Sequence, residues 1–86
     1  MPEISRFYGI VIRMNIGEHN PPHFHAIYGG SDAAFLIDGT LLRSGTFPPQ
    51  AVRLVSRWAK LHRLELLDNW NRLRADQSTT KIKPLE

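Results

Sequence analysis

Residues 23–43, HFHAIYGGSDAAFLIDGTLLR, contain the signals that decide the fold. Runs rich in β-branched and aromatic residues, with apolar residues at alternate positions, are typical of strands. Glycine-containing turns separate these runs, and Asp38-Gly39 is a preferred pair for a two-residue type I′ hairpin. The stretch therefore predicts antiparallel strands over residues 23–28, 33–37 and 40–43.

The spacing of the turns also predicts which side chains share a face. A loop over residues 29–32 sets Ala26 opposite Phe35, and the Asp-Gly turn sets Phe35 opposite Leu42. We expect the core face to carry Phe24, Ala26, Tyr28, Ala33, Phe35, Ile37 and Leu42. The opposite face is mixed, and so is either partly covered or a binding surface; it carries His23, His25, Ile27, Ala34, Leu36, Leu41 and Arg43.

The flanking segments complete an α+β fold. Residues 5–14 predict a buried strand that Gly9 interrupts with a bulge or a close backbone approach. After Pro48-Pro49, apolar residues recur at helical spacing as far as Leu73, but the pattern breaks near Arg63. We expect a single domain over residues 1–86: an antiparallel meander of about four strands packed against one long helix or two consecutive helices, with residues 80–85 as a candidate edge strand.

Composition narrows the class of protein. Apolar residues make up 42% and charged residues 22% of the 86-residue chain, as in ordinary globular domains. The chain has no cysteine, no export signal and no apolar run long enough to cross a membrane, so we expect a cytoplasmic protein. The net charge of +3 and the pI near 9.8 are compatible with an anionic partner such as RNA.

Histidines are concentrated just before and within the strand over residues 23–28. His23 and His25 stand ~6.6 Å apart at Cα on one face of a strand, and His19 approaches from the preceding loop. The pattern leaves three interpretations open: hydrogen-bonded structural rings, metal ligands, or acid-base groups that contact phosphate. A lone His62 within the apolar arc of the helix is more typical of a core residue.

The two chemical interpretations involve different sets of residues. For a metal site, the expected ligands are His23, His25 and Asp38, which the predicted register places opposite His23, with Glu18 as the other candidate carboxylate. For metal-free RNA cleavage, His23, His25 and His19 supply acid and base, with no cofactor. In that case we expect the phosphate ligands to be Arg43, Arg13 and Arg6.

Several motifs resemble a known bacterial family. They are the opening MPEISRFYGI, the central PPHFHA, the Pro-Pro before a helix with Trp-Ala and Leu-His-Arg, and the closing IKPL. Together they resemble domain-of-unknown-function family 4160 over nearly the whole chain. This resemblance implies a compact cytoplasmic protein that is often encoded beside a second small protein, in arrangements that look like toxin-antitoxin pairs. It implies no catalytic residue.

Two functions from different classes follow as expectations. The first is a toxin-like, RNA-directed component of a two-gene module, with the histidine cluster as a ribonuclease-type site. The second is a binding partner or regulator without enzyme activity, whose protein interface includes Leu64, Leu67 and Trp70 because these side chains do not fit one buried stripe. A small metal-binding protein is the third alternative. We expect the neighbouring gene's product as partner, and a homo-oligomer remains compatible with the sequence.

Overall fold

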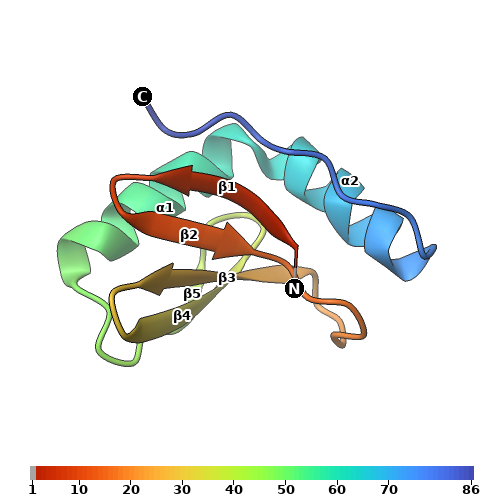
Figure 1. Ribbon diagram of the computed structural model, residues 1–86. Coiled ribbons are helices and arrows are strands. Elements are labelled where there is room, and N and C mark those ends of the chain that lie inside the picture. Colours follow the sequence, from red (N-terminus) through yellow and green to blue (C-terminus); the bar gives the residue numbers. More distant parts are fainter. Residues whose placement is uncertain (1) are drawn as a thin grey trace.

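The computed structural model describes residues 2–86, which form one antiparallel sheet followed by two helices (Figure 1). Each strand pairs with the next along the chain, in the order β1-β2-β3-β4-β5. The elements are β1 (Glu3–Phe7), β2 (Ile10–Arg13), β3 (His23–Tyr28), β4 (Ser31–Leu36), β5 (Leu41–Arg43), α1 (Pro49–Leu61) and α2 (Arg63–Arg74). The predicted α+β meander is confirmed, with the two-helix alternative at its end.

The sheet has five strands because the segment predicted as one interrupted strand is a hairpin. Tyr8 and Gly9 form the turn between β1 and β2, with φ of 52° and 79°. Positive φ at both central positions is the geometry of a type I′ turn, whose twist matches that of the flanking strands. Gly9 therefore marks a reversal of the chain, and the predicted bulge is wrong.

The turn between β3 and β4 is also tighter than predicted. Tyr28 pairs with Ser31 across Gly29-Gly30, and Ala26 lies opposite Ala33 in place of Phe35. This register differs from the predicted one by two residues, so every side chain keeps its face of the sheet. As a result Ala26, Ala33 and Phe35 are buried in the core as expected.

The predicted register is only partly correct between β4 and β5. Ala34 pairs with Arg43 as the Asp-Gly turn implies, but a bulge then sets Leu41 opposite Phe35. The bulge leaves Leu42 outside the core, with 52% of its surface exposed. Tyr28, at the tip of β3, is 40% exposed, so both residues were wrongly assigned to the core.

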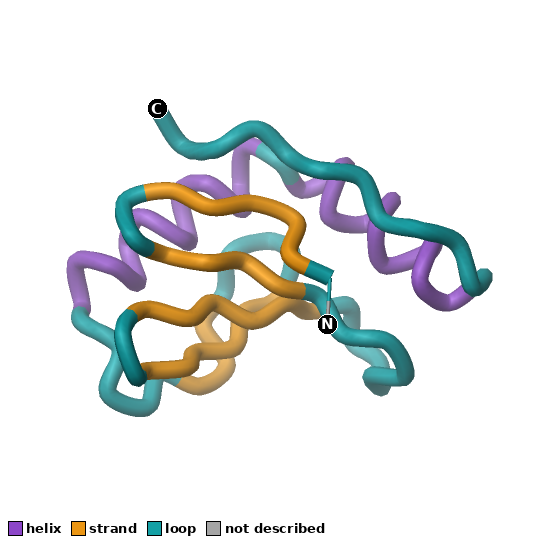
Figure 2. Tube along the Cα trace, viewed as in Figure 1, coloured by secondary structure: helices purple, strands orange, loops and turns teal. Residues whose placement is uncertain are grey.

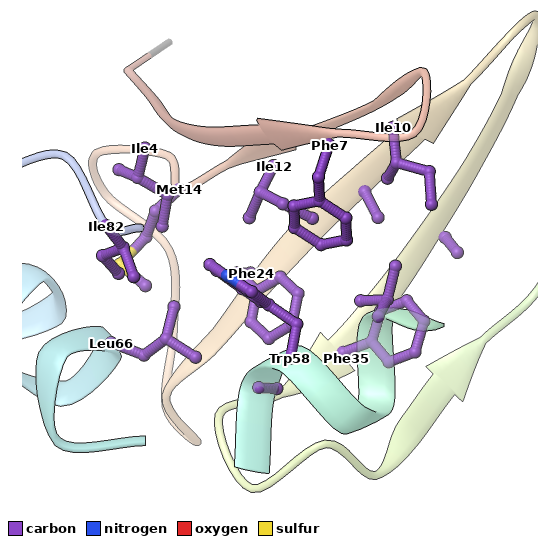
Figure 3. Close-up of a cluster of buried hydrophobic side chains, with 14 of the residues drawn as sticks. Ile4, Phe7, Ile10, Ile12, Met14, Phe24, Phe35, Trp58, Leu66 and Ile82 are labelled. Carbon is purple, nitrogen blue, oxygen red and sulfur yellow. The ribbon is translucent and has the colours of Figure 1, made fainter. Parts of the chain in front are cut away.

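The core lies between the sheet and α1. The indole of Trp58 packs on Phe24 and Phe7, with ring centroids 5.7 and 5.4 Å apart (Figure 3). Leu66 of α2 extends this cluster toward Met14 and Ile82. No helix in residues 2–86 is both long and apolar enough to cross a membrane.

The chain after α2 returns along β1 as an extended tail (Figure 2). The amide of Ile82 donates to the Ile4 carbonyl at 2.8 Å, and the Ser5 hydroxyl donates to the Ile82 carbonyl at 2.9 Å. The tail forms no regular strand, so the expected edge strand over residues 80–85 is absent from the described structure. It nevertheless covers the outer edge of β1, and Leu85 is buried with Ile82.

Candidate metal centre

Glu18, His23 and His25 converge at the start of β3. Glu18 lies in the loop that joins β2 to β3, and the two histidines are the first and third residues of β3. One nitrogen or oxygen atom of each side chain lies within 4.8 Å of the corresponding atoms of the other two. We call these three residues the Glu18 cluster.

Strand geometry brings the two imidazoles together. His23 and His25 alternate with Phe24, which is fully buried on the core face, so both project from the opposite face. Their ring centroids lie 5.4 Å apart and their planes are inclined by 74°. The two rings therefore share one side of the strand and present nitrogens to a common point.

The Glu18 carboxylate lies between these nitrogens. Its Oε1 is 2.9 Å from His25 Nε2, and its Oε2 is 3.2 Å from His23 Nε2. The side chains of His23, His25 and Glu18 are 13%, 15% and 28% exposed. The cluster is thus partly shielded from water but still accessible to a small ligand.

Neighbouring groups fix the orientation of the cluster. His23 Nδ1 lies 2.8 Å from the carbonyl oxygen of Pro21, which can only accept, so Nδ1 carries the hydrogen. In the neutral ring, Nε2 then keeps its lone pair and directs it at Glu18. This arrangement is typical of metal-binding histidines, whose second nitrogen donates to a carbonyl or carboxylate.

The amide of Asn15 holds the carboxylate. Asn15 Nδ2 donates to Glu18 Oε1 at 3.0 Å. This bond, together with the contacts to His25 and His23, holds the pKa of Glu18 below its usual value of 4.5 despite partial burial. Glu18 is therefore an anion at neutral pH, as a metal ligand must be.

Helix α2 supports the cluster from one side. The ring of Trp70 lies 5.4 Å from that of His23, centroid to centroid, and Trp70 is only 3% exposed. Beside this contact, the loop before β3 and the end of α2 border a cleft of about 380 Å³. The cleft is lined by Asn15, Ile16, Gly17, Glu18, His19, Trp70, Leu73, Arg74 and Asp76.

Asp38 does not belong to the cluster, so its predicted position opposite His23 is wrong. The register places Leu36 opposite His23, while Asp38 lies in the turn between β4 and β5. There its carboxylate accepts from the Thr40 amide at 2.9 Å, a bond that lowers the pKa of Asp38. Glu18, the second candidate in the sequence, is the carboxylate that the fold brings to the histidines.

The remaining histidines lie outside the cluster. His19 is exposed and lines the cleft next to Glu18, without joining the three converging side chains. His62 ends α1, where its Nδ1 lies 2.6 Å from Glu65 Oε1 and its ring packs on Trp58. His62 is therefore half-buried and hydrogen-bonded, as the interpretation as a core residue implies.

The arginines expected to hold phosphate lie on the same face of the sheet as the histidines. Arg13 lies directly opposite His25 in the β2–β3 ladder. On the other side of β3, His25 lies opposite Ala34, which in turn lies opposite Arg43, so these residues form one row across the sheet. Arg6 lies on β1 opposite Val11, in the adjacent row. Residues directly opposite each other in antiparallel strands share a face, so the sheet brings these guanidinium groups to the histidine side.

The three residues of the expected protein interface differ in how far the fold exposes them. Leu64 is 71% exposed on α2, and Leu67 is half-buried. Trp70 faces inward against His23 and is buried, so of the three residues Leu64 and Leu67 alone reach the surface of α2.

Comparison with protein families connects these observations to one family. The family model described as "Domain of unknown function (DUF4160)" matches residues 9–71. This range includes the whole Glu18 cluster and both helices apart from the last turn of α2. Comparisons with curated proteins and with solved structures found no match to this chain. The family match agrees with the resemblance of the sequence motifs, and the chain belongs to the DUF4160 family.

Proposed function

We propose that this domain binds a divalent transition-metal ion through one carboxylate oxygen of Glu18 and the Nε2 atoms of His23 and His25. The observation that carries the proposal is the convergence of these three atoms within 4.8 Å. Two imidazoles and one carboxylate form the ligand set of many catalytic zinc and non-haem iron sites. Such a set leaves coordination positions open for water or another ligand.

The contacts of His23 call for a cation between its Nε2 and Glu18, either a proton or a metal ion. Because Nδ1 donates to Pro21, a neutral His23 directs a lone pair at Glu18 Oε2, which is also an acceptor, across 3.2 Å. Two acceptors in contact repel each other unless a proton or a metal ion lies between them. His25, by contrast, can satisfy Glu18 Oε1 with an ordinary Nε2 hydrogen at 2.9 Å.

Calorimetric titration of untagged protein with Zn²⁺ and Co²⁺ tests this proposal. We expect one metal ion per chain, and loss of that binding in His23→Ala and Glu18→Ala variants. His62→Ala is the matched control, because His62 also contacts a carboxylate but lies outside the cluster. Binding that the cluster variants leave intact, or wild-type protein that takes up neither metal, would refute the proposal.

The second candidate function is the RNA-directed, toxin-like member of a two-gene module. It is favoured by the pair of imidazoles 5.4 Å apart beside Glu18, since adjacent histidines can act as base and acid in cleavage of RNA at the 2′-hydroxyl. On this account Arg6, Arg13 and Arg43 would hold phosphate, and a small neighbouring protein would neutralise the activity.

Chelation separates the two candidates. Metal-free cleavage predicts RNA degradation and growth arrest that persist in EDTA-treated protein and disappear in a His23→Ala, His25→Ala double variant. Purified protein that leaves RNA intact with and without metal, and expression that leaves growth unchanged, would exclude the toxin-like role.

A further inference from the structure

The three arginines on the histidine face differ in their partners. Arg6 donates to both carboxylate oxygens of Glu3, at 3.0 and 2.8 Å. Arg43 lies 3.4 Å from Asp32. Arg13 forms no hydrogen bond or ion pair with any of residues 2–86 at the distances that define these contacts.

Arg13 also has a hydrogen-bond donor without a partner. Its Nε is buried without a hydrogen-bond partner. Glu3 lies opposite Arg13 on β1, but its carboxylate accepts from Arg6, and this hydrogen bonding is the main cause of the lowered pKa of Glu3. A buried guanidinium nitrogen without an acceptor is unfavourable, so the surroundings of Arg13 favour an additional acceptor.

The neighbour of Arg13 on the other side is a proposed metal ligand. Arg13 and His25 are directly opposite in the β2–β3 ladder, which sets their Cβ atoms about 5 Å apart. A divalent ion held by one carboxylate and two neutral imidazoles keeps one net positive charge, and Arg13 adds another. A ligand carrying negative charge on several oxygens would balance both cations.

We propose that the metal centre and Arg13 together bind a phosphoryl oxyanion. This inference depends on the proposed metal site: one phosphate oxygen occupies an open coordination position, and the planar guanidinium of Arg13 donates to the free oxygens that remain. Arginine suits this role because its parallel N–H groups match the spacing of phosphate oxygens. The oxyanion comes either from a small phosphate monoester or from the backbone of RNA, both of which present free anionic phosphate oxygens.

Cobalt-loaded protein allows this proposal to be tested separately from metal binding. Orthophosphate, AMP and a short oligouridylate are titrated in turn, and the visible spectrum of the bound Co²⁺ reports entry into its coordination sphere. We expect Arg13→Gln to keep one Co²⁺ per chain and to weaken phosphate binding by about ten-fold or more. Arg57→Gln, at an exposed arginine of α1, is the matched control and should leave phosphate binding unchanged.

Each outcome decides the inference. Binding of orthophosphate and AMP without the oligonucleotide identifies a small phosphate ligand, whereas tighter binding of the oligonucleotide identifies RNA. Metal uptake without any spectral response to the three probes, or an equal response in Arg13→Gln, overturns the inference and leaves the metal site standing. Absence of uptake of both Co²⁺ and Zn²⁺ refutes both. Arg13→Lys keeps the positive charge but lacks the two parallel N–H donors. If it folds and partly restores the phosphate binding lost in Arg13→Gln, the loss is not due to misfolding and the inference is supported.

Discussion

The indole of Trp70 packs on the imidazole of His23, with ring centroids 5.4 Å apart and planes inclined by 50°. This contact joins α2 to the first residue of β3 and so links the packing of the C-terminal helix to the geometry of the Glu18 cluster. Because Trp70 is 3% exposed, it serves both the core and the candidate site.

Replacement of Trp70 by alanine should therefore lower both stability and metal affinity. We expect a loss of about 3–5 kcal/mol in the free energy of unfolding, as for other buried aromatic side chains. Urea denaturation of the metal-free protein measures this loss. Leu64→Ala, at an exposed position of the same helix, should change stability by less than about 0.5 kcal/mol. Similar effects of the two substitutions would contradict the role assigned to Trp70.

Asn15 should tune the metal site without contacting the ion. Its amide donates to Glu18 Oε1 at 3.0 Å and orients the carboxylate. Asn15→Ala should weaken Zn²⁺ binding by about 10–100-fold, the usual effect of losing a group that orients a ligand. Asn71→Ala, an exposed asparagine on α2, serves as control in the same calorimetric titration. Unchanged affinity in Asn15→Ala would show that Glu18 is held by other contacts.

Acidification should remove the stabilisation that Glu18 provides. The pKa of Glu18 is lowered in the folded protein, mainly by the hydrogen bond from Asn15, so the folded state binds the proton less tightly than the unfolded state. The contribution is therefore present above the usual value of 4.5 and is lost as the pH falls through the lowered pKa. In EDTA, the difference in unfolding free energy between wild type and Glu18→Gln should be largest near neutral pH. A difference that stays constant down to strongly acidic pH would be inconsistent with this account.

Asn69 should be a major determinant of how the tail is held. It is fully buried, donates to the Thr80 carbonyl at 2.9 Å and accepts from the Thr80 amide at 2.8 Å. Asn69→Ala leaves both backbone groups of Thr80 without this partner, and we expect a loss of about 2–3 kcal/mol in unfolding free energy. Proteolysis of the tail should be faster in this variant than in wild type. Equal cleavage rates would show that Ile82 and the other tail contacts are sufficient.

The fold was predictable because alternation and turn residues specify it locally. A shift of the strand register by an even number of residues leaves Phe24 and Ala26 on the core face. The core residues of β3 were therefore predicted correctly although the turn at Gly29-Gly30 was not. The hairpin at Tyr8-Gly9 was missed because a non-glycine residue takes the left-handed conformation there, and tyrosine gives no signal for it.

The candidate site was only half predictable for a related reason. His23 and His25 follow from strand periodicity, but the third ligand depends on the path of an irregular loop. Periodicity says nothing about how residues 14–22 fold back, whereas a register error of two residues was enough to place Asp38 wrongly beside His23. The acidic residue nearest in sequence to the histidines, Glu18, was the better guide.

Anomalous diffraction at the zinc edge, from crystals grown with Zn²⁺, tests the central claim most directly. The account predicts one strong peak per chain between Glu18, His23 and His25, at about 2.0–2.2 Å from a carboxylate oxygen and the two Nε2 atoms. No peak at this position, or a peak only at His62 and Glu65, would contradict it.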